Sequence, residues 1–191
     1  MRVAGYPDMS IDKVEIVYES GNLQFNGAGA VILNWSALGD PERNPGYTKD
    51  QAERDLKHWF GVSKIVFIEG VPESDRTDGH VDGIARFIDT NTVVVGRCTS
   101  ESLCKPDDGK TASLLDTAAQ IIGEAGFSVI SETMEGIAQF AGQRFDANYL
   151  NWLVGNGFLI TTGYGIENLD LRAKARLQSI FPIVISMFYP C

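Results

Sequence analysis

The segment Asp75–Asp82 gathers residues that could do chemistry. It holds one of the two histidines of the chain, and its sequence is Asp-Arg-Thr-Asp-Gly-His-Val-Asp. We expect Gly79 to open a strand that places His80 and Asp82 on one face, because strand side chains alternate. Histidine can relay a proton near neutral pH, and a carboxylate offers two acceptors to a planar guanidinium. The pair predicts a site for a cationic group rich in hydrogen-bond donors.

Other interpretations of the same segment stay open. His80 and Asp82 could be a hydrogen-bonded pair that fixes a turn, and Asp78 could either orient His80 or cap a turn. Asp75 is expected to be an exposed loop carboxylate. Asp78, His80 and Asp82 could also hold a metal, but no further cluster of histidines or cysteines supports one. We therefore predict neither a metal nor another cofactor.

The composition is that of a globular chain with excess negative charge. Of 191 residues, 44% are hydrophobic, and 16 lysines and arginines against 25 acidic residues give a net charge of −9. This balance argues against nucleic acid and against an anionic membrane surface as partners. It suits a small cationic substrate, because negative clefts concentrate cations. We expect neither a membrane span nor a signal peptide, because no apolar run has the required length and position.

The cysteines Cys98, Cys104 and Cys191 are an odd number in a chain large enough to bury a core. Neither their spacing nor their neighbours suggest zinc. We expect reduced thiols and a cytoplasmic location, because disulfides are rare in reducing compartments.

A unit of two hairpin strands, a helix and a strand occurs three times, after one strand at 14–18. Apolar runs mark the strands, and apolar residues at helical spacing mark the helices. We expect the units at 21–25, 28–33, 49–60 and 64–69, at 84–88, 92–97, 111–125 and 127–130, and at 149–154, 158–162, 167–180 and 183–189. The segments 98–110 and 131–147 are expected to be loops. Helix starts about sixty residues apart indicate repeated units that pack against their neighbours.

Local signals mark the ends of elements in the first unit. Asn26-Gly27 between two apolar runs is a strong hairpin signal. Thr48 is the expected N-cap of the helix, and Gln51 completes a capping box. Gly61 is the expected stop, and the aromatic pair at 59–60 is expected to be mostly core.

Thr77–Asp82 resembles the Thr-Asp-Gly-His-Val-Asp signature of the agmatine deiminase and bacterial peptidyl-arginine deiminase family. Four other elements resemble family motifs in the same order along the chain. They are Glu19-Ser20-Gly21-Asn22, Arg43-Asn44-Pro45, Tyr149-Leu150-Asn151-Trp152 with Asn156-Gly157, and Phe181-Pro182. Jointly these matches are far more specific than any one motif.

The resemblance implies the pentein fold, in which five ββαβ modules surround a pseudo-fivefold axis. We therefore expect an α/β fold that is an incomplete pentein-like α/β propeller. One strand would precede three ββαβ modules, at roughly 20–69, 83–131 and 148–189, in a single domain of residues 1–191.

The chemistry that the resemblance implies is hydrolysis of a guanidinium to a ureido group and ammonia without a metal. A cysteine thiolate attacks the guanidinium carbon, a histidine moves protons, and two carboxylates hold the guanidinium nitrogens. By position, His80 and Asp82 would be catalytic, while Asp82, Asp78 and Glu19 would bind the substrate. Glu19 could act by pairing with an arginine, and Arg43 is expected to anchor the loop before the helix.

Two parts of the family site have no counterpart in this sequence. They are an upstream Arg-Asp-x-Gly-Pro element, which carries the other carboxylate, and a C-terminal Gly-x-His-Cys, where this chain has Phe-Tyr-Pro-Cys. Cys191 is therefore either a nucleophile or a terminal residue without a role. We expect a truncated, catalytically incomplete protein that binds a guanidino compound, such as agmatine or arginine, or a partner.

Two alternatives remain. One is an active hydrolase that is completed by Cys191 or by another chain, and the other is a structural or interaction module. Three modules would leave apolar faces and strand edges uncovered, so we also expect a homo-oligomer.

Overall fold

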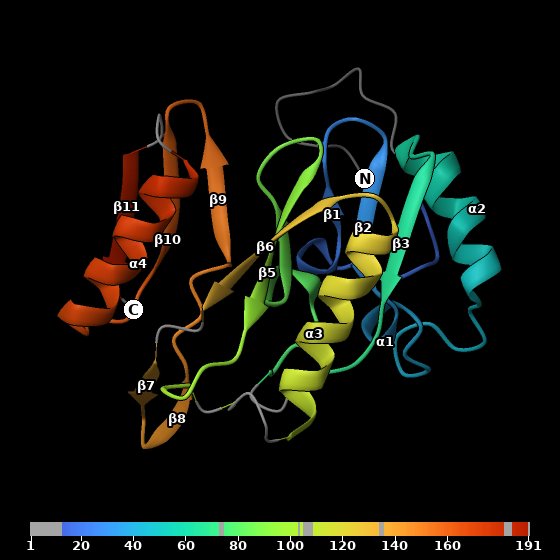
Figure 1. Cartoon of the computed structure of the whole chain (residues 1–191). Coiled ribbons are helices and arrows are strands. Elements are labelled where there is room, and N and C mark those ends of the chain that lie inside the picture. The colour runs from blue at the N-terminus through green and yellow to red at the C-terminus, as the bar shows by residue number, and fades with distance from the viewer. Residues whose placement is uncertain are drawn as a thin grey trace.

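The computed structural model describes residues 13–72, 75–102, 104, 109–133, 136–181 and 185–190. It contains three units with the same order of elements, each a three-stranded sheet with one helix (Figure 1). The first unit holds β1 (Gln24–Phe25), β2 (Ala30–Asn34), α2 (Lys49–Phe60) and β3 (Lys64–Ile68). The second holds β4 (Ala85–Phe87), β5 (Thr92–Arg97), α3 (Gly109–Glu124) and β6 (Ser128–Thr133). The third holds β9 (Trp152–Gly155), β10 (Phe158–Gly163), α4 (Glu167–Ile180) and β11 (Ile185–Pro190).

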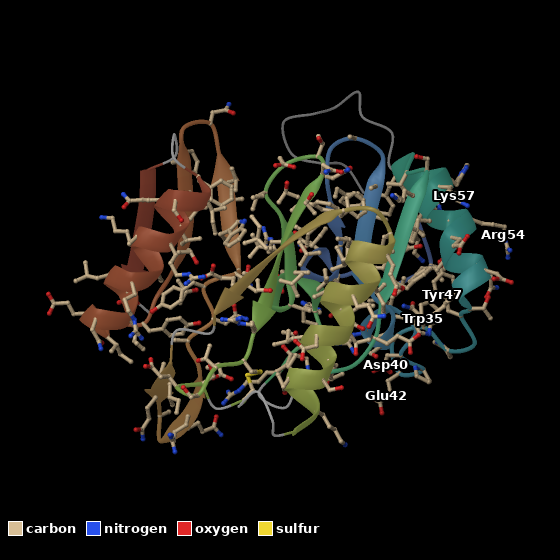
Figure 2. All side chains as sticks on the ribbon, viewed as in Figure 1. Trp35, Asp40, Glu42, Tyr47, Arg54 and Lys57 are labelled. Atoms are coloured by element: carbon tan, nitrogen blue, oxygen red, sulfur yellow. A yellow bond between two sulfur atoms is a disulfide. The ribbon has the colours of Figure 1, made fainter. Side chains whose placement is uncertain are left out.

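Shorter elements occupy the connections. The 3-10 helices η1 (Ser20–Asn22) and η2 (Val81–Gly83) precede β1 and β4, α1 (Trp35–Leu38) follows β2, and a hairpin of β7 (Ile137–Phe140) and β8 (Gln143–Asp146) precedes the third unit. Trp35 of α1 stacks on Tyr47, with ring centroids 6.4 Å apart, beside α2 (Figure 2). Within the described ranges, no helix is both long enough and apolar enough to cross a bilayer.

The three sheets share one topology. The middle strands β2, β5 and β10 pair antiparallel with the strand before them and parallel with the strand after the helix. A helical crossover between parallel neighbours is the usual connection, because parallel strands cannot be joined by a tight turn. The predicted α/β class and the three strand–strand–helix–strand orders are therefore confirmed. Their arrangement as an incomplete propeller stays a prediction.

The middle strand of the first sheet is buried on both faces. Val31 and Leu33 of β2 belong to a core with Leu56 of α2. Ile32, which points the other way, belongs to a core with Leu115 of α3. Helix α3 contacts β3 as well as β5 and β6, so it lies between the first and second sheets (Figure 1).

The second sheet has the same double burial. Val93 of β5 packs in the core that it shares with β2 and α3, whereas Val94 packs with Leu159 and Leu177 of the third unit. Because each unit shares a core with its neighbour, the three units are not independent packing bodies. The expectation of a single domain of residues 1–191 stays a prediction.

Helix α2 begins and ends as predicted. The Thr48 side chain accepts from the Gln51 backbone at 3.3 Å, and Gln51 Oε1 accepts from the Thr48 backbone at 2.9 Å. Gly61 ends the helix in the left-handed region, with φ +66°. The prediction that Trp59 and Phe60 are core is wrong, because they are 42% and 43% exposed. The last turn of the helix reaches the surface, where Phe60 packs on the rings of Phe25 and Tyr18.

Several predicted segments differ from the structure. The expected strands at 21–25 and 149–154 are shorter, because residues 20–22 form η1 and β9 begins only at Trp152. Residues 14–18 do not form a strand, because the backbone of Val17 bonds with the Asn44 side chain instead of with a neighbouring strand. The expected loop at 131–147 contains the β7–β8 hairpin. Its turn is Ala141-Gly142, with Ala141 at φ +50°. The sequence has no hairpin signal here, because the turn lacks the usual Asn-Gly or Asp-Gly pair.

Cys98 and Cys104 form a disulfide, so the prediction of reduced thiols is wrong for this pair. Their Cα atoms lie 5.3 Å apart, and between them the Ser102 backbone donates to the Thr99 carbonyl in a turn. That separation is typical of disulfides. The predicted cytoplasmic location loses one of its reasons and stays a prediction, while Cys191 lies outside the described residues.

Thiol titration tests the disulfide. In denaturant without reductant we expect at most one free thiol per chain, and three after reduction. Reduction should lower the free energy of unfolding by about 2 kcal/mol, because the unfolded chain loses a closed loop. A Cys98→Ser/Cys104→Ser variant is the control, since reductant should leave its stability unchanged. Three free thiols in the unreduced protein would contradict the pairing.

Candidate functional site

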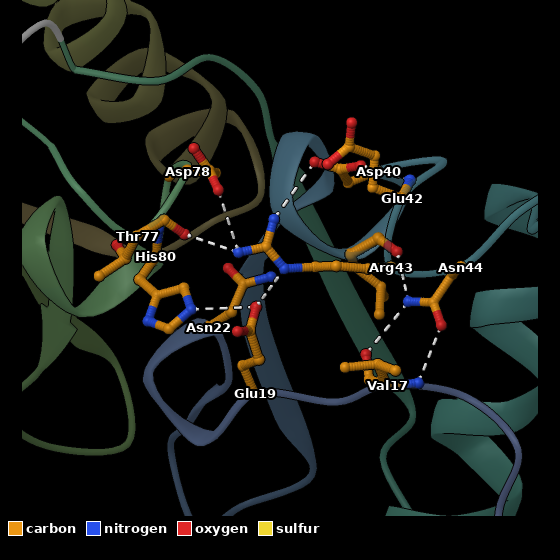
Figure 3. A network of polar contacts seen from close by, with 12 residues as sticks. Val17, Glu19, Asn22, Asp40, Glu42, Arg43, Asn44, Thr77, Asp78 and His80 are labelled. Atoms are coloured by element: carbon orange, nitrogen blue, oxygen red, sulfur yellow. Dashed lines mark hydrogen bonds and ion pairs between the residues drawn. The ribbon is translucent and has the colours of Figure 1, made fainter.

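Three segments meet around the residues that the sequence pointed to. They are residues 19–22 at η1, the loop 40–44 after α1, and the connection 75–83 that leads from β3 into η2. The two 3-10 helices contact each other and η2 also contacts β2. Figure 3 shows the polar contacts that join the three segments.

His80 has a carboxylate near each of its ring nitrogens. Its Nε2 is buried and lies 3.1 Å from Glu19 Oε2, an ion-pair distance that is not aligned as a hydrogen bond (Figure 3). Its Nδ1 lies near Asp82, since a Cβ added to Gly21 would be 2.5 Å from His80 Nδ1 and 2.7 Å from Asp82 Oδ2. The backbone of η1 therefore packs directly against the histidine and the aspartate, and only glycine leaves room for both.

His80 and Asp82 come together for a different reason from the predicted one. Residues 81–83 form a turn of 3-10 helix, so the alternation of a strand does not apply. The tight turn brings Asp82 back beside His80, where both face Gly21.

Asp75 fixes the loop that carries His80. Its Oδ2 accepts from the backbone N–H of Thr77 at 2.9 Å and of Gly79 at 2.7 Å. Thr77 Oγ1 in turn accepts from the His80 backbone at 3.3 Å. The expected exposed loop carboxylate is thus a turn-forming residue. Aspartate favours turns because its side chain can bond the backbone two residues further on, as Asp75 does with Thr77.

Buried asparagines hold the same loop against β2. The Asn22 side chain donates to the Asn34 carbonyl and accepts from the Asn34 N–H, both at 2.9 Å. The Asn34 side chain donates from Nδ2 to the Gly70 carbonyl at 2.6 Å. Gly79 lies against this amide with φ +95°, and a Cβ there would be 2.8 Å from Asn34 Nδ2. The hydrogen bonds therefore tie η1 to β2 and β2 to Gly70 after β3, while Gly79 of the His80 loop packs against the Asn34 side chain.

The segment before Glu19 is held by side chains. Asn44 Nδ2 donates to the Val17 carbonyl at 3.1 Å, and its Oδ1 accepts from the Val17 N–H at 2.8 Å. The hydroxyl of Tyr18 lies 2.9 Å from that of Tyr47. These contacts place Glu19 without a sheet.

Arg43 joins all three segments. Its Nε lies 2.7 Å from Glu19 Oε2, its Nη1 3.2 Å from Asp40 Oδ2, and its Nη2 3.3 Å from Asp78 Oδ2 (Figure 3). Nη2 also donates to the Thr77 carbonyl at 3.2 Å. Burial lowers the pKa of Arg43, but Glu19 and Asp78 raise it by more. The pairing of Glu19 with an arginine is present, and Arg43 does anchor its loop.

Asp82 and Arg86 influence each other electrostatically. Burial raises the pKa of Asp82, and His80 and Arg86 lower it only in part. Burial lowers the pKa of Arg86, and Asp82 offsets part of that effect. Arg86 Nη2 donates to the Trp152 carbonyl at 2.6 Å, and the guanidinium lies 5.5 Å from the Trp152 ring centroid. Asp82 is therefore linked to β9 in the third unit.

The structure brings Glu19, His80 and Asp82 together. Asp78 is directed to Arg43 instead of His80, and its side chain is 67% exposed. Cys191 lies outside the described residues. Among those that are described, no three histidine, cysteine or acidic side chains are grouped as metal ligands. The cluster can offer carboxylates to a cation and an imidazole for proton transfer.

A Gly21→Ala substitution tests the close packing at η1. The added methyl group must displace His80 or Asp82, and overpacking of this kind lowers the free energy of unfolding by about 1–3 kcal/mol. Gly83→Ala is the matched control, because its Cβ would meet only Asn148 Nδ2 at 3.6 Å. Chemical denaturation of both variants measures the difference. Equal stabilities of the two variants would contradict the packing.

The raised pKa of Asp82 makes a prediction with a definite sign. Protonated Asp82 stabilises the fold at a pH below its unfolded pKa, and this stability is lost as the pH rises through the folded pKa. An Asp82→Asn variant cannot ionise. Its stability relative to the parent should therefore rise between about pH 4 and about pH 7, measured by urea denaturation.

Asp89→Asn is the control, with the opposite sign. Hydrogen bonds from Asn91 and Thr92 lower the pKa of Asp89, so its ionised form stabilises the fold above the unfolded pKa. Relative to the parent, this variant should lose stability as the pH rises from about pH 2 to about pH 4, the range below the unfolded pKa. If both differences ran in the same direction, the assignment for Asp82 would be wrong.

The comparisons with known proteins agree with the sequence motifs. The family model for Porphyromonas-type peptidyl-arginine deiminase matches residues 2–185. The agmatine deiminase of Medicago truncatula is 26% identical over 186 aligned residues, which cover 87% of this chain and 50% of that protein. A solved agmatine deiminase from C. jejuni with substrate bound matches at a TM-score of 0.81 and 26% identity, over 95% of this chain and 53% of that one.

This chain spans about half the length of the curated relatives it matches. The family model covers almost the whole of this chain, and its range includes Glu19, His80 and Asp82. The chain therefore belongs to the Porphyromonas-type peptidyl-arginine deiminase family.

Proposed function

We propose that this chain binds a small molecule with a guanidinium group, such as agmatine or arginine, at Glu19, His80 and Asp82, as part of a deiminase site. The observation that carries the proposal is the position of His80 between two carboxylates. Its Nε2 lies 3.1 Å from Glu19 Oε2, and its Nδ1 packs against Gly21 beside Asp82 Oδ2. The net charge of −9 favours a cationic ligand. A relative with the same fold was solved with its substrate bound.

Each of the three residues has a role in the proposed reaction. Asp82 accepts hydrogen bonds from the guanidinium nitrogens, since a carboxylate matches the planar N–H fork. His80 gives a proton to the nitrogen that leaves as ammonia and takes one from the water that enters. Glu19 holds the imidazole from its Nε2 side and adds negative charge beside the cation.

The reaction also needs a nucleophile. Its bond to the guanidinium carbon forms as ammonia leaves, and water then breaks that bond to release the ureido product. Within the proposal, the nucleophile is Cys191 or a group from another chain. If neither nucleophile is in place, the chain binds the guanidine without completing the reaction. The expected homo-oligomer, and the expected lack of nucleic-acid and membrane partners, stay predictions.

Calorimetry and ammonia release test the proposal with agmatine, free arginine and an arginine-containing peptide. We expect Asp82→Asn to weaken agmatine binding about 10-fold or more, the loss of a charged hydrogen bond. His80→Ala should reduce ammonia release about 100-fold or more. His58→Ala is the matched control, because His58 is exposed on α2.

The outcomes separate the three functions. Release of ammonia that depends on His80 supports a hydrolase, and Cys191→Ser then shows whether that thiol is the nucleophile. Binding that depends on Asp82, without release, supports a guanidine-binding protein. If none of the three compounds bound at millimolar concentration, the proposal would fail and the module would be structural.

A further inference from the structure

We infer that Arg43 is the positioning residue that orients the Glu19 carboxylate toward His80. Its importance for catalysis rests on the proposed function, but the orientation itself does not. The inference goes beyond the anchoring of a loop, because it assigns the geometry of the Glu19–His80 pair to one guanidinium.

One carboxylate oxygen of Glu19 contacts both Arg43 and His80. Glu19 Oε2 lies 2.7 Å from Arg43 Nε and 3.1 Å from His80 Nε2. Because the same oxygen makes both contacts, a rotation of the carboxylate that loses the arginine also changes the approach to the histidine. The shorter of the two contacts is to the arginine, so Arg43 sets the position.

The guanidinium is itself fixed from three directions. Nη1 meets Asp40, while Nη2 meets both the Asp78 carboxylate and the Thr77 carbonyl. All three nitrogens are engaged, and the partners come from three segments of the chain (Figure 3). Such a planar fork holds several acceptors at once, which the single ammonium group of lysine cannot do.

The positive charge of Arg43 is also needed to keep Glu19 in its position. Glu19, Asp40 and Asp78 all lie around it, and its own side chain is only 19% exposed. Without the cation, Glu19 and Asp40, whose side chains are 34% and 25% exposed, would lie near each other and near exposed Asp78 with no positive charge between them. Glu19 would then turn away from its acidic neighbours and leave its contact with His80.

The chain offers a direct spectroscopic test, because it holds only two histidines. Long-range proton–nitrogen NMR spectra of the imidazole rings report on His80, while exposed His58 on α2 serves as an internal reference. In Arg43→Gln we expect the His80 signals to move and the His58 signals to stay. Arg54→Gln, which removes an exposed arginine of α2, should move neither set beyond local effects.

Two further variants decide between charge and orientation. Arg43→Lys keeps the charge but not the fork, so it should leave the His80 signals displaced. Asp40→Asn removes one anchor of the guanidinium without touching Glu19, and we expect a smaller displacement in the same direction. If Arg43→Gln does not fold, these two variants still decide the matter. Unchanged His80 signals in a folded Arg43→Gln, or a parent-like spectrum in Arg43→Lys, would overturn the inference.

The activity readout keeps this inference separate from the proposed function. If the parent chain releases ammonia from agmatine, Arg43→Gln should lower kcat about 10-fold or more and change KM less than about threefold, since Arg43 acts through Glu19. Displaced His80 signals in a chain that binds no guanidine would support the positioning role and reject the proposed function. If the parent chain binds agmatine but the His80 signals are unchanged in Arg43→Gln, the proposed function is supported and the positioning role is rejected.

Discussion

A carboxylate that is withdrawn from water must keep a positive or proton-donating group beside it, and the site is arranged around this constraint. Glu19 meets it through Arg43 and His80. Asp82 meets it less completely, and its raised pKa reflects the remaining cost of burial. The loops at 40–44 and 75–83 are held where they are by the polar groups that these charges require. A cation from outside would find carboxylates that are already partly desolvated and fixed.

The fixed geometry comes from short polar contacts between loops, on a scaffold of sheets. The sheets contribute buried middle strands, and β2 supplies Asn34, whose backbone bonds Asn22 of η1 and whose side-chain amide bonds Gly70 and lies against Gly79. Two glycines complete the arrangement, because Gly21 and Gly79 allow backbone to lie against polar groups where a side chain would collide. The scaffold determines where the loops begin, and the hydrogen bonds determine where their side chains point.

Much of this could be predicted from the sequence because it depends on local patterns. The bounds of α4 follow from helical periodicity, and the start of α2 from a capping box between Thr48 and Gln51. Asp78, His80 and Asp82 followed from the Thr77–Asp82 signature, and Glu19 from the Glu19–Asn22 element. What the sequence did not reveal depends on contacts within and between irregular segments, which follow no periodic pattern. The backbone bonds of Val17 go to Asn44, Asp75 accepts from Gly79, and Cys98 pairs with Cys104 beside a turn between Thr99 and Ser102.

The link from Arg86 to β9 has a consequence for the dynamics of the molecule. Separation of the third unit from the second would break the hydrogen bond to Trp152 and leave a half-buried guanidinium beside Asp82 with less compensation. It would also expose Val94, which packs among residues of the third unit. The two units are thus expected to open as one cooperative step. Amide exchange in β9 would then proceed at the rate at which the charged cluster around Asp82 loses its order, although β9 lies in the third sheet and Asp82 in the 3-10 helix before the second.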